Sequence, residues 1–320
     1  MHDLHMLPKV RDSWSYLYVE HCRIDQEDKA IALHDANGKT PVPCASLTLL
    51  MVGPGTTVTH AAIRVLAETG CTVLWVGERG VRCYAQGLGE TRSSANLQRQ
   101  VRLWAAPELH LRVVRRMYEA RFPEPLDPDL TLQQIRGKEG IRVREAYAQA
   151  SRAYGVEWHG RAYNRQDWAL SDPVNRALSA ANSCLYGICH AAILSAGYSP
   201  ALGFVHTGKQ LSFVYDIADL YKAEFTIPAS FAAVAENTRM IDTAVRWKCR
   251  DLFHEKRLLA RIVDDIANLL SVAGGGDSTT MDELAVDEDM ALPGEIWDPS
   301  GDVDGGVNYG EEPEMGANQL

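Results

Sequence analysis

The chain has 320 residues, with 42 acidic and 32 basic side chains and a formal net charge of −10. Such a balance argues against a nucleic-acid ligand, because phosphate binding needs basic surface. However, residues 274–320 contain 13 of the acidic residues and no Lys or Arg. The first 273 residues therefore hold 29 acidic and 32 basic side chains, so this part of the chain is mildly basic and a nucleic-acid ligand is not excluded.

The composition is that of a soluble globular protein, with 46% hydrophobic and 23% charged residues. No apolar run approaches the roughly 20 residues of a membrane span, and the N-terminus lacks the apolar core of a signal peptide. The 7 cysteines form no CxxC pair. We therefore expect reduced, partly buried thiols and a cytoplasmic protein without membrane contact.

Residues 1–90 are predicted to be rich in β-strands. Asn37-Gly38 is a strong hairpin-turn signal, and Thr57 or Thr59 can cap a short helix that ends near Gly70. The strand-like runs are 13–19, 30–34, 47–52, 71–76 and 81–85.

From about Ser94 the hydrophobic period becomes helical. Thr131 and Gln134 have the spacing of a capping box, and Asp172-Pro173 opens a long apolar helix that Gly197 closes. The predicted helices are 94–121, 131–154, 172–196, 211–221, 228–236, 240–254 and 256–272.

We therefore predict an α+β protein of three parts. Residues 1–90 form a small β-rich domain, and residues 91–273 form a larger α-helical catalytic domain. Residues 274–320 are acidic and Gly-rich with few large apolar side chains, so we expect a disordered tail.

The first candidate site lies around His206, Asp216 and Asp219. The two aspartates are three residues apart on a predicted helix and share one face, in apolar surroundings where carboxylates are costly to bury without a cation. Carboxylates plus one imidazole suit Mg²⁺ or Mn²⁺ better than zinc. The alternative is an N-terminal helix cap plus an ordinary surface acid, with His206 a satisfied loop histidine, and the pattern alone does not exclude it.

Glu139 is the second candidate, a single acid among four bases on a predicted helix that also carries Gly137 and Gly140. Each glycine costs about 1 kcal/mol relative to Ala, which suggests that another backbone or a ligand approaches closely. The alternative is an intrahelical salt bridge from Glu139 to Arg142 or Arg136.

Between Arg79 and Arg165 we count 16 basic and 9 acidic residues, a local excess of 7 positive charges. The aromatic residues Trp158, Tyr163 and Trp168 lie near the end of this segment. Basic residues beside aromatic ones are typical of a surface that tracks a phosphate backbone and stacks on bases. A solvated helix face is the alternative.

The motifs GFVHTGK at 203–209 and SFVYDIAD at 212–219 resemble a known family. It is the CRISPR-associated integrase and endonuclease family of spacer acquisition, the first-numbered Cas proteins, in the type I-E form. The resemblance extends over about residues 10–272 and includes IRGKEG at 135–140, WVGE at 75–78, VTHAA at 58–62 and SCLYG at 183–187.

The resemblance implies a metal-dependent DNA integrase and endonuclease, in which Glu139, His206 and Asp219 hold Mg²⁺ or Mn²⁺ and Asp216 is a neighbouring acid of undecided role. It also implies a homodimer that joins the small second-numbered Cas protein in a heterohexamer. This complex would capture prespacer DNA and insert it at the leader–repeat junction by 3′-hydroxyl attack, without another cofactor. The candidate DNA-binding residues are Arg82, Arg136, Arg161, Tyr163, Trp168, Tyr186, Lys209, Lys222 and Arg246.

Two departures and two competing functions accompany the resemblance. His21 stands where type I-E relatives can carry a Tyr that splays the duplex end, and the tail is more acidic than the family requires. The tail is either a solubilising appendage or a DNA mimic that competes for the basic groove. The competing functions are a catalytically silent DNA-binding scaffold and a branched-DNA repair nuclease that needs no partner.

Overall fold

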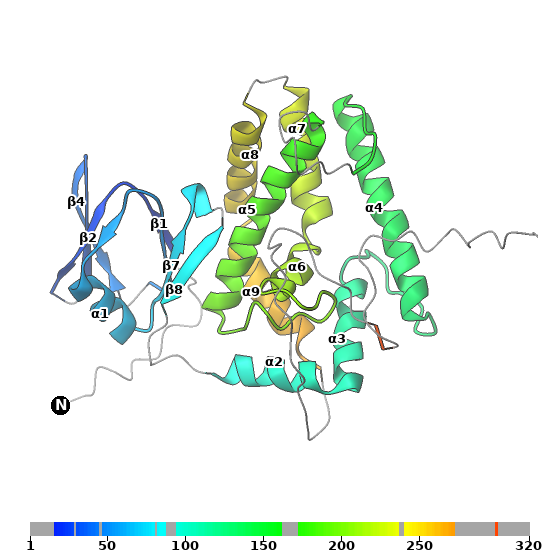
Figure 1. The fold of residues 1–320 in the computed structure, drawn as a ribbon, viewed down its shortest axis with the longest axis horizontal. Coiled ribbons are helices and arrows are strands. Elements are labelled where there is room, and N and C mark those ends of the chain that lie inside the picture. Colours follow the sequence, from blue (N-terminus) through cyan, green and yellow to red (C-terminus); the bar gives the residue numbers. More distant parts are fainter. Residues whose placement is uncertain are drawn as a thin grey trace, which may run out of the picture.

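The protein is seen here as a computed structural model that describes residues 16–28, 30–44, 47–80, 82–87, 94–161, 172–236, 240–272 and 298–299. A β-rich N-terminal part is followed by a helical part, as the sequence predicts, and the two lie beside each other (Figure 1). The predicted boundary at residue 90 falls between the last strand of the first part and the first helix of the second, outside the described residues.

The N-terminal part contains two four-stranded sheets, in the orders β1-β5-β7-β8 and β4-β3-β2-β6. In the first sheet only the β7–β8 pair is antiparallel. The strands are β1 (Tyr16–Val19), β2 (Arg23–Glu27), β3 (Ala30–Asp35), β4 (Gly38–Pro43), β5 (Leu49–Val52), β6 (Thr57–Val58), β7 (Thr72–Val76) and β8 (Cys83–Gly87).

Helix α1 (His60–Glu68) closes the core of the N-terminal part. Its N-cap is Thr59, whose side chain accepts a hydrogen bond from the backbone N–H of Ala62 at 3.3 Å. Gly70 follows the helix with φ of 68°, as a left-handed C-terminal residue should. Buried side chains of α1 pack with Ile24, Leu50 and other apolar residues of both sheets.

The helical part surrounds one long apolar helix, α5 (Pro173–Ser195), whose buried side chains belong to the largest hydrophobic cluster. The other helices are α2 (Ala95–Ala105), α3 (Pro107–Glu119), α4 (Leu132–Tyr154), α6 (Ser212–Ala218), α7 (Ile227–Ala235), α8 (Ile241–Glu255) and α9 (Leu258–Leu269). Helix α5 is long and apolar enough to pass a length-and-composition test for a membrane span, but it is mostly buried among these helices, as the core helix of a globular domain is.

Helix α5 also joins the two parts, because it packs against β7, β8 and the short helix η3 (Glu78–Gly80). Gly187 is the point of closest approach: a Cβ atom added there would collide with the carbonyl oxygen of Gly80. Only a glycine lets two backbones come this close, so Gly187 fixes how α5 docks on the β-rich part.

Several predicted end signals are confirmed. Thr131 and Gln134 form the capping box of α4, and Gly155 ends that helix in the left-handed conformation. Asp172 caps α5 by accepting a hydrogen bond from the N–H of Asn175 at 3.0 Å.

The prediction of one helix over 94–121 is wrong, because α2 and α3 are separated at Ala106, whose backbone is extended with ψ of 112°. Pro107 disfavours a helical conformation in the residue before it and starts a new helix. The predicted strand runs also lack β2, β4 and β6, and a short π-helix, η5 (Lys222–Thr226), directly after α6 was not predicted either.

Candidate active site

The loop that carries His206 is built around Asp216. The backbone N–H groups of Phe204, Val205 and His206 donate to the carboxylate of Asp216 at 2.6, 3.1 and 2.8 Å. Asp216 lies on α6 and is fully buried. Its carboxylate therefore compensates three buried amide groups and folds the loop into one shape.

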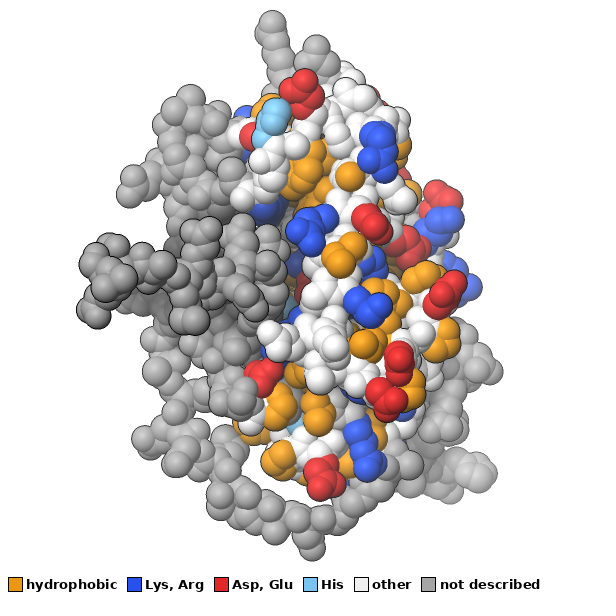
Figure 2. Space-filling view, turned by 90° about the vertical axis from the view of Figure 1, so that its right-hand side faces the viewer, with side chains coloured by type: hydrophobic (Ala, Val, Ile, Leu, Met, Phe, Trp, Pro, Cys, Tyr) orange, Lys and Arg blue, Asp and Glu red, His pale blue; other side chains and the backbone are white. Residues whose placement is uncertain are grey.

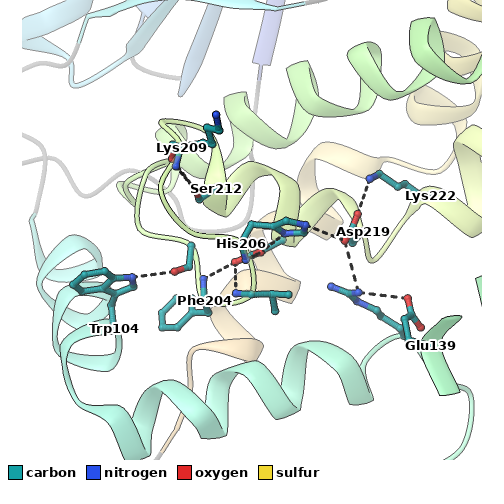
Figure 3. A network of polar contacts seen from close by, with 12 residues as sticks. Trp104, Glu139, Phe204, His206, Lys209, Ser212, Asp219 and Lys222 are labelled. Atoms are coloured by element: carbon teal, nitrogen blue, oxygen red, sulfur yellow. Dashed lines mark hydrogen bonds and ion pairs between the residues drawn. The ribbon is translucent and has the colours of Figure 1, made fainter. Parts of the chain in front are cut away.

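Neighbouring elements hold the same loop from outside. Trp104 of α2 donates to the carbonyl oxygen of Gly203 at 3.0 Å (Figure 3). His110 of α3 contacts the carbonyl oxygen of Phe204 at 2.9 Å. A Cβ on Gly203 would collide with the carbonyl oxygen of His206. The sequence GFVH is thus constrained at both ends.

Asp216 also orients the imidazole of His206, because His206 Nδ1 lies 2.8 Å from Asp216 Oδ1. This contact turns Nε2 toward Asp219, whose Oδ2 lies 4.0 Å away. A carboxylate behind a histidine fixes its ring and tautomer and raises its basicity as a ligand. Of the roles that the sequence leaves open for Asp216, orientation of His206 is the one that this geometry supports.

Asp219, the C-cap of α6, is surrounded by cations. Lys222 Nζ lies 2.7 Å from Asp219 Oδ1, and Arg121 Nη1 lies 3.7 Å from Asp219 Oδ2. Burial opposes ionisation of Asp219, but the positive charges of Lys222 and Arg121 outweigh it and hold the pKa of its carboxyl group well below the usual value. Conversely, burial would lower the pKa of Lys222, yet its contact with Asp219 raises it.

Glu139 reaches the same place from a different element, α4. It is 12% exposed, and Arg142, one turn further along the helix, binds it with two hydrogen bonds of 2.7 and 2.8 Å. Arg121 Nη1 contacts its Oε1 at 3.4 Å. Glu139 therefore forms the intrahelical salt bridge to Arg142, and it also contacts Arg121, which is distant in the sequence.

Arg121 is the residue that sequence reasoning missed. It follows the end of α3, its side chain is 3% exposed, and its guanidinium lies 4.8 Å from the centre of the Tyr118 ring. Burial would lower its pKa, but Asp219 and Glu139 raise it. Nothing in its local sequence marks it, since its role depends on bringing α3, α4 and α6 together.

The donor set fits a hard divalent cation, because it consists of two carboxylates and one oriented imidazole. The carboxylates of Glu139 and Asp219 already converge on one positive charge, the Arg121 guanidinium, and Nε2 of His206 faces the second of them (Figure 3). Within the described ranges, however, no three His, Cys, Asp or Glu side chains lie close enough together to hold a metal ion as they stand.

The predicted DNA-binding residues lie at different distances from this centre. Tyr186 of α5 is beside it, with Lys222 Nζ 5.3 Å from its ring centre, and Arg82 lies next to Gly187. Lys209 lies three residues after His206, where its backbone N–H donates to Ser212 at 3.0 Å. Lys222 and Tyr186 therefore lie together past the C-terminal end of α6, whereas Lys209 precedes its N-terminal end and the backbone of Arg82 lies beside the middle of α5.

The others are more scattered. Arg136 precedes Glu139 on α4 and pairs with Asp298 at 2.7 Å, while Arg161 contacts Asn175 at 3.5 Å. Arg246 is on α8, and Tyr163 and Trp168 lie outside the described residues. On the face of α4 shown in Figure 2, basic, acidic and apolar side chains alternate without forming a continuous basic strip.

Comparison with known proteins identifies the family. A family profile described as "CRISPR associated protein Cas1" matches residues 15–124 and 122–242. The chain belongs to the Cas1 family. It is 54% identical over 318 residues to the CRISPR-associated endonuclease Cas1 2 of Thermus thermophilus, covering 99% of this chain and 97% of that protein.

Other relatives agree with this assignment. The CRISPR-associated endonuclease Cas1 of Escherichia coli is 44% identical over 263 residues, or 82% of this chain and 86% of that protein. A crystal structure of a TtCas1–DNA complex superimposes with a TM-score of 0.77 at 57% identity, covering 83% of this chain and 99% of that one. A casposase bound to its integration product shares only the fold, with a TM-score of 0.56 at 14% identity over 80% of this chain and 95% of that one.

Proposed function

We propose that this Cas1 protein is a divalent-metal-dependent DNA endonuclease and integrase of CRISPR adaptation. The observation that carries the proposal is the convergence of Glu139, Asp219 and the oriented His206 from three separate elements. Two carboxylates that share Arg121, and an imidazole that faces the second of them, are the donor types that metal-dependent phosphoryl transfer on a nucleic acid uses. The relatives named endonucleases and the DNA complex of TtCas1 support a DNA substrate.

In the proposed reaction, the 3′-hydroxyl oxygen of a captured DNA fragment attacks a phosphodiester of the repeat. A new P–O bond forms, the old one breaks and the 3′-oxygen of the repeat strand leaves, so no nucleoside triphosphate is needed. Mg²⁺ or Mn²⁺, held by Glu139, His206 and Asp219, would lower the pKa of the attacking hydroxyl and neutralise charge on the phosphate oxygens.

The chain's own residues prepare this centre. Asp216 fixes the ring of His206, so that Nε2 faces the ligand set without reorganisation. Arg121 and Arg142 hold the carboxylate of Glu139. Lys222 and Tyr186, which lie together beside Asp219, are placed to contact the phosphate and the base of a strand that enters there.

For the assembly we propose a homodimer that joins the second-numbered Cas protein in a heterohexamer, acts on prespacer and leader–repeat DNA in the cytoplasm, and belongs to type I-E. The support is the resemblance of the long motifs over about residues 10–272 to that subtype.

The test is joining of a labelled prespacer to a leader–repeat plasmid, with Mg²⁺ or Mn²⁺ and the small partner present. His206→Ala and Asp219→Ala are expected to lose joining by at least about 100-fold, since each removes a metal ligand. Asp242→Asn is the control, because Asp242 is also an ion-paired acid, 3.1 Å from Arg176, but lies on α8.

Wild-type joining by either ligand variant would refute the proposed centre. A second assay omits the small Cas partner and uses splayed DNA duplexes as the substrate. If the isolated protein cuts them as fast as the complex does, the protein is a partner-independent repair nuclease. Binding without joining or cutting, under either metal, would show a silent scaffold.

A further inference from the structure

The centre compensates its own negative charges. Its linked carboxylates are Glu139, Asp216 and Asp219, and the cations in contact with Glu139 and Asp219 are Arg121, Arg142 and Lys222. Three negative and three positive charges therefore meet in one mostly buried cluster. The three carboxylates and the three cations therefore have a formal net charge of zero.

We infer that a divalent cation and DNA bind this centre cooperatively, each strengthening the binding of the other. This inference rests on the proposed function and goes one step beyond it. A site made only of carboxylates attracts a divalent cation by itself. Here the cation enters a neutral site and leaves two uncompensated positive charges in a region of low exposure, which is unfavourable.

The phosphate groups of DNA are the natural compensation for that excess. Once a strand lies beside the centre, its negative oxygens offset the added charge, and the cation in turn makes the centre attractive to the strand. Coupling of this kind is reciprocal: the factor by which DNA tightens metal binding equals the factor by which metal tightens DNA binding.

The three internal cations differ in how firmly they are held. Arg121 stacks on Tyr118 and is buried, and its Nε and Nη2 atoms have no hydrogen-bond acceptor within the described residues, so the ring and the two carboxylates position it. Arg142 binds Glu139 through two hydrogen bonds, from its Nε and Nη2 atoms. Lys222 holds Asp219 through one ammonium group on a flexible stem, which also hydrogen-bonds Tyr186, and its side chain is 26% exposed.

Lys222 is therefore the cation that can move. It can leave Asp219 when a metal ion binds and turn toward an incoming phosphate, while Arg121 remains as a positioning residue for the two carboxylates. Lys222 contacts Oδ1 of Asp219 and Arg121 contacts Oδ2, so the departure of Lys222 leaves Arg121 in place.

The experiment is a Mn²⁺ titration of the full-length protein, followed by the electron paramagnetic resonance signal of free Mn²⁺. It is done with and without a splayed DNA duplex whose 3′ ends lack the hydroxyl group, so that no joining occurs. For the wild type we expect DNA to tighten Mn²⁺ binding by about 5- to 150-fold, the usual range of coupling between two sites.

Lys222→Met removes one internal positive charge. Free protein carrying this change should bind Mn²⁺ about tenfold more tightly than the wild type, and the effect of DNA should shrink correspondingly. Lys248→Met is the matched control, since Lys248 is ion-paired to Glu236 and 29% exposed but lies on α8. It should behave as the wild type does.

Two results would overturn the inference: equal Mn²⁺ affinity of the wild type with and without DNA, or a Lys222→Met titration identical to the wild type. Failure of the proposed function has a different signature. His206→Ala would then leave both Mn²⁺ titrations unchanged, showing that the ion binds elsewhere. If His206→Ala loses strand joining but DNA does not tighten Mn²⁺ binding to the wild type, the proposed function is retained and the cooperative binding is rejected.

Discussion

Asp216 shows how one side chain can serve both the fold and the site. Its carboxylate accepts three backbone hydrogen bonds and the contact from His206. Asparagine keeps the shape but replaces one acceptor oxygen by an NH₂ group, which would face a donor. Both oxygens of Asp216 already accept hydrogen bonds, so the new NH₂ group would leave buried donors without an acceptor.

For Asp216→Asn we expect a loss of about 1–3 kcal/mol in the free energy of unfolding, from the unsatisfied amide groups. Mn²⁺ affinity in the DNA complex should also fall by about 10- to 100-fold, the usual effect of removing a group that orients a ligand. Urea unfolding and the Mn²⁺ titration measure the two effects separately. Unchanged metal affinity at reduced stability would show that Asp216 only supports the loop.

His190 gives a pH dependence at the same scale. Burial on α5 lowers its pKa to about 4, from an ordinary value of 6.5. Between pH 4 and pH 6.5 the unfolded chain therefore binds more protons at His190 than the folded chain does. The contribution of His190 to the free energy of unfolding is fully present above pH 6.5 and is lost as the pH falls toward 4.

The expected contribution is about 2 kcal/mol of unfolding free energy lost between pH 7 and pH 5. His190→Gln removes this part of the dependence, so urea unfolding of both proteins at the two pH values should show a smaller difference for the variant. Parallel stability profiles would mean that the imidazole is accessible to protons in the native state.

At the scale of elements, local signals predicted what lies within one stretch of chain. Thr59, the Thr131 capping box and Asp172 each mark a helix start by hydrogen bonds to residues two or three positions away. Strand β2 was missed because its residues, RIDQE, are mostly polar and half-exposed, and pairing with β3 and β6 holds them in a sheet.

The site divides in the same way. The pattern around His206, Asp216 and Asp219 is visible because these residues share one loop and one helix. The contact from Arg121 to both Glu139 and Asp219 depends on how α3, α4 and α6 pack, and no local pattern contains that information. The resemblance to a family brought Glu139 into the predicted set, whereas Arg121 required the structure.

The glycines of two helices provide a matched pair of tests. A Cβ on Gly137 of α4 would have no neighbour within 4 Å among the described residues, so no described backbone approaches there, and approach of a ligand stays a prediction. Gly137→Ala should stabilise the protein by about 1 kcal/mol in urea unfolding. DNA affinity, measured by fluorescence anisotropy, should fall several-fold if a strand passes this helix face.

Gly187→Ala should lower the free energy of unfolding, in contrast to Gly137→Ala. Because an added Cβ collides with the backbone of Gly80, α5 must shift from the β-rich part, at a cost of about 1–3 kcal/mol. Urea unfolding of this variant beside Gly137→Ala measures the contrast. If Gly187→Ala were as stable as the wild type, the two parts would not depend on that contact for their docking.

At the scale of the whole molecule, the acidic C-terminal segment contacts the helical part near the proposed centre. Only Asp298 and Pro299 of it are described, and Asp298 pairs with Arg136, a predicted DNA contact beside Glu139. This contact favours the DNA-mimic interpretation over a simple appendage. The predicted disorder of the segment lies outside the described residues.

Asp298→Asn should therefore raise DNA affinity about two- to fivefold at low salt, because one negative charge no longer competes with a phosphate for Arg136, which keeps its contact with Tyr118. The gain should shrink between about 50 and 200 mM salt, since both contacts are electrostatic. Glu314→Gln removes a charge from the same segment and is the control. Equal affinities of Asp298→Asn and the wild type would make the segment an appendage.

The pair between Asp298 and Arg136 is intramolecular, and that determines how it must be studied. A tethered competitor acts at an effective concentration set by the chain that connects it, typically millimolar for a short flexible linker, and not at the concentration of the protein. Diluting the sample cannot dissociate it. If Arg136 contacts DNA as predicted, every DNA-binding curve of the intact chain would include the cost of separating Arg136 from Asp298.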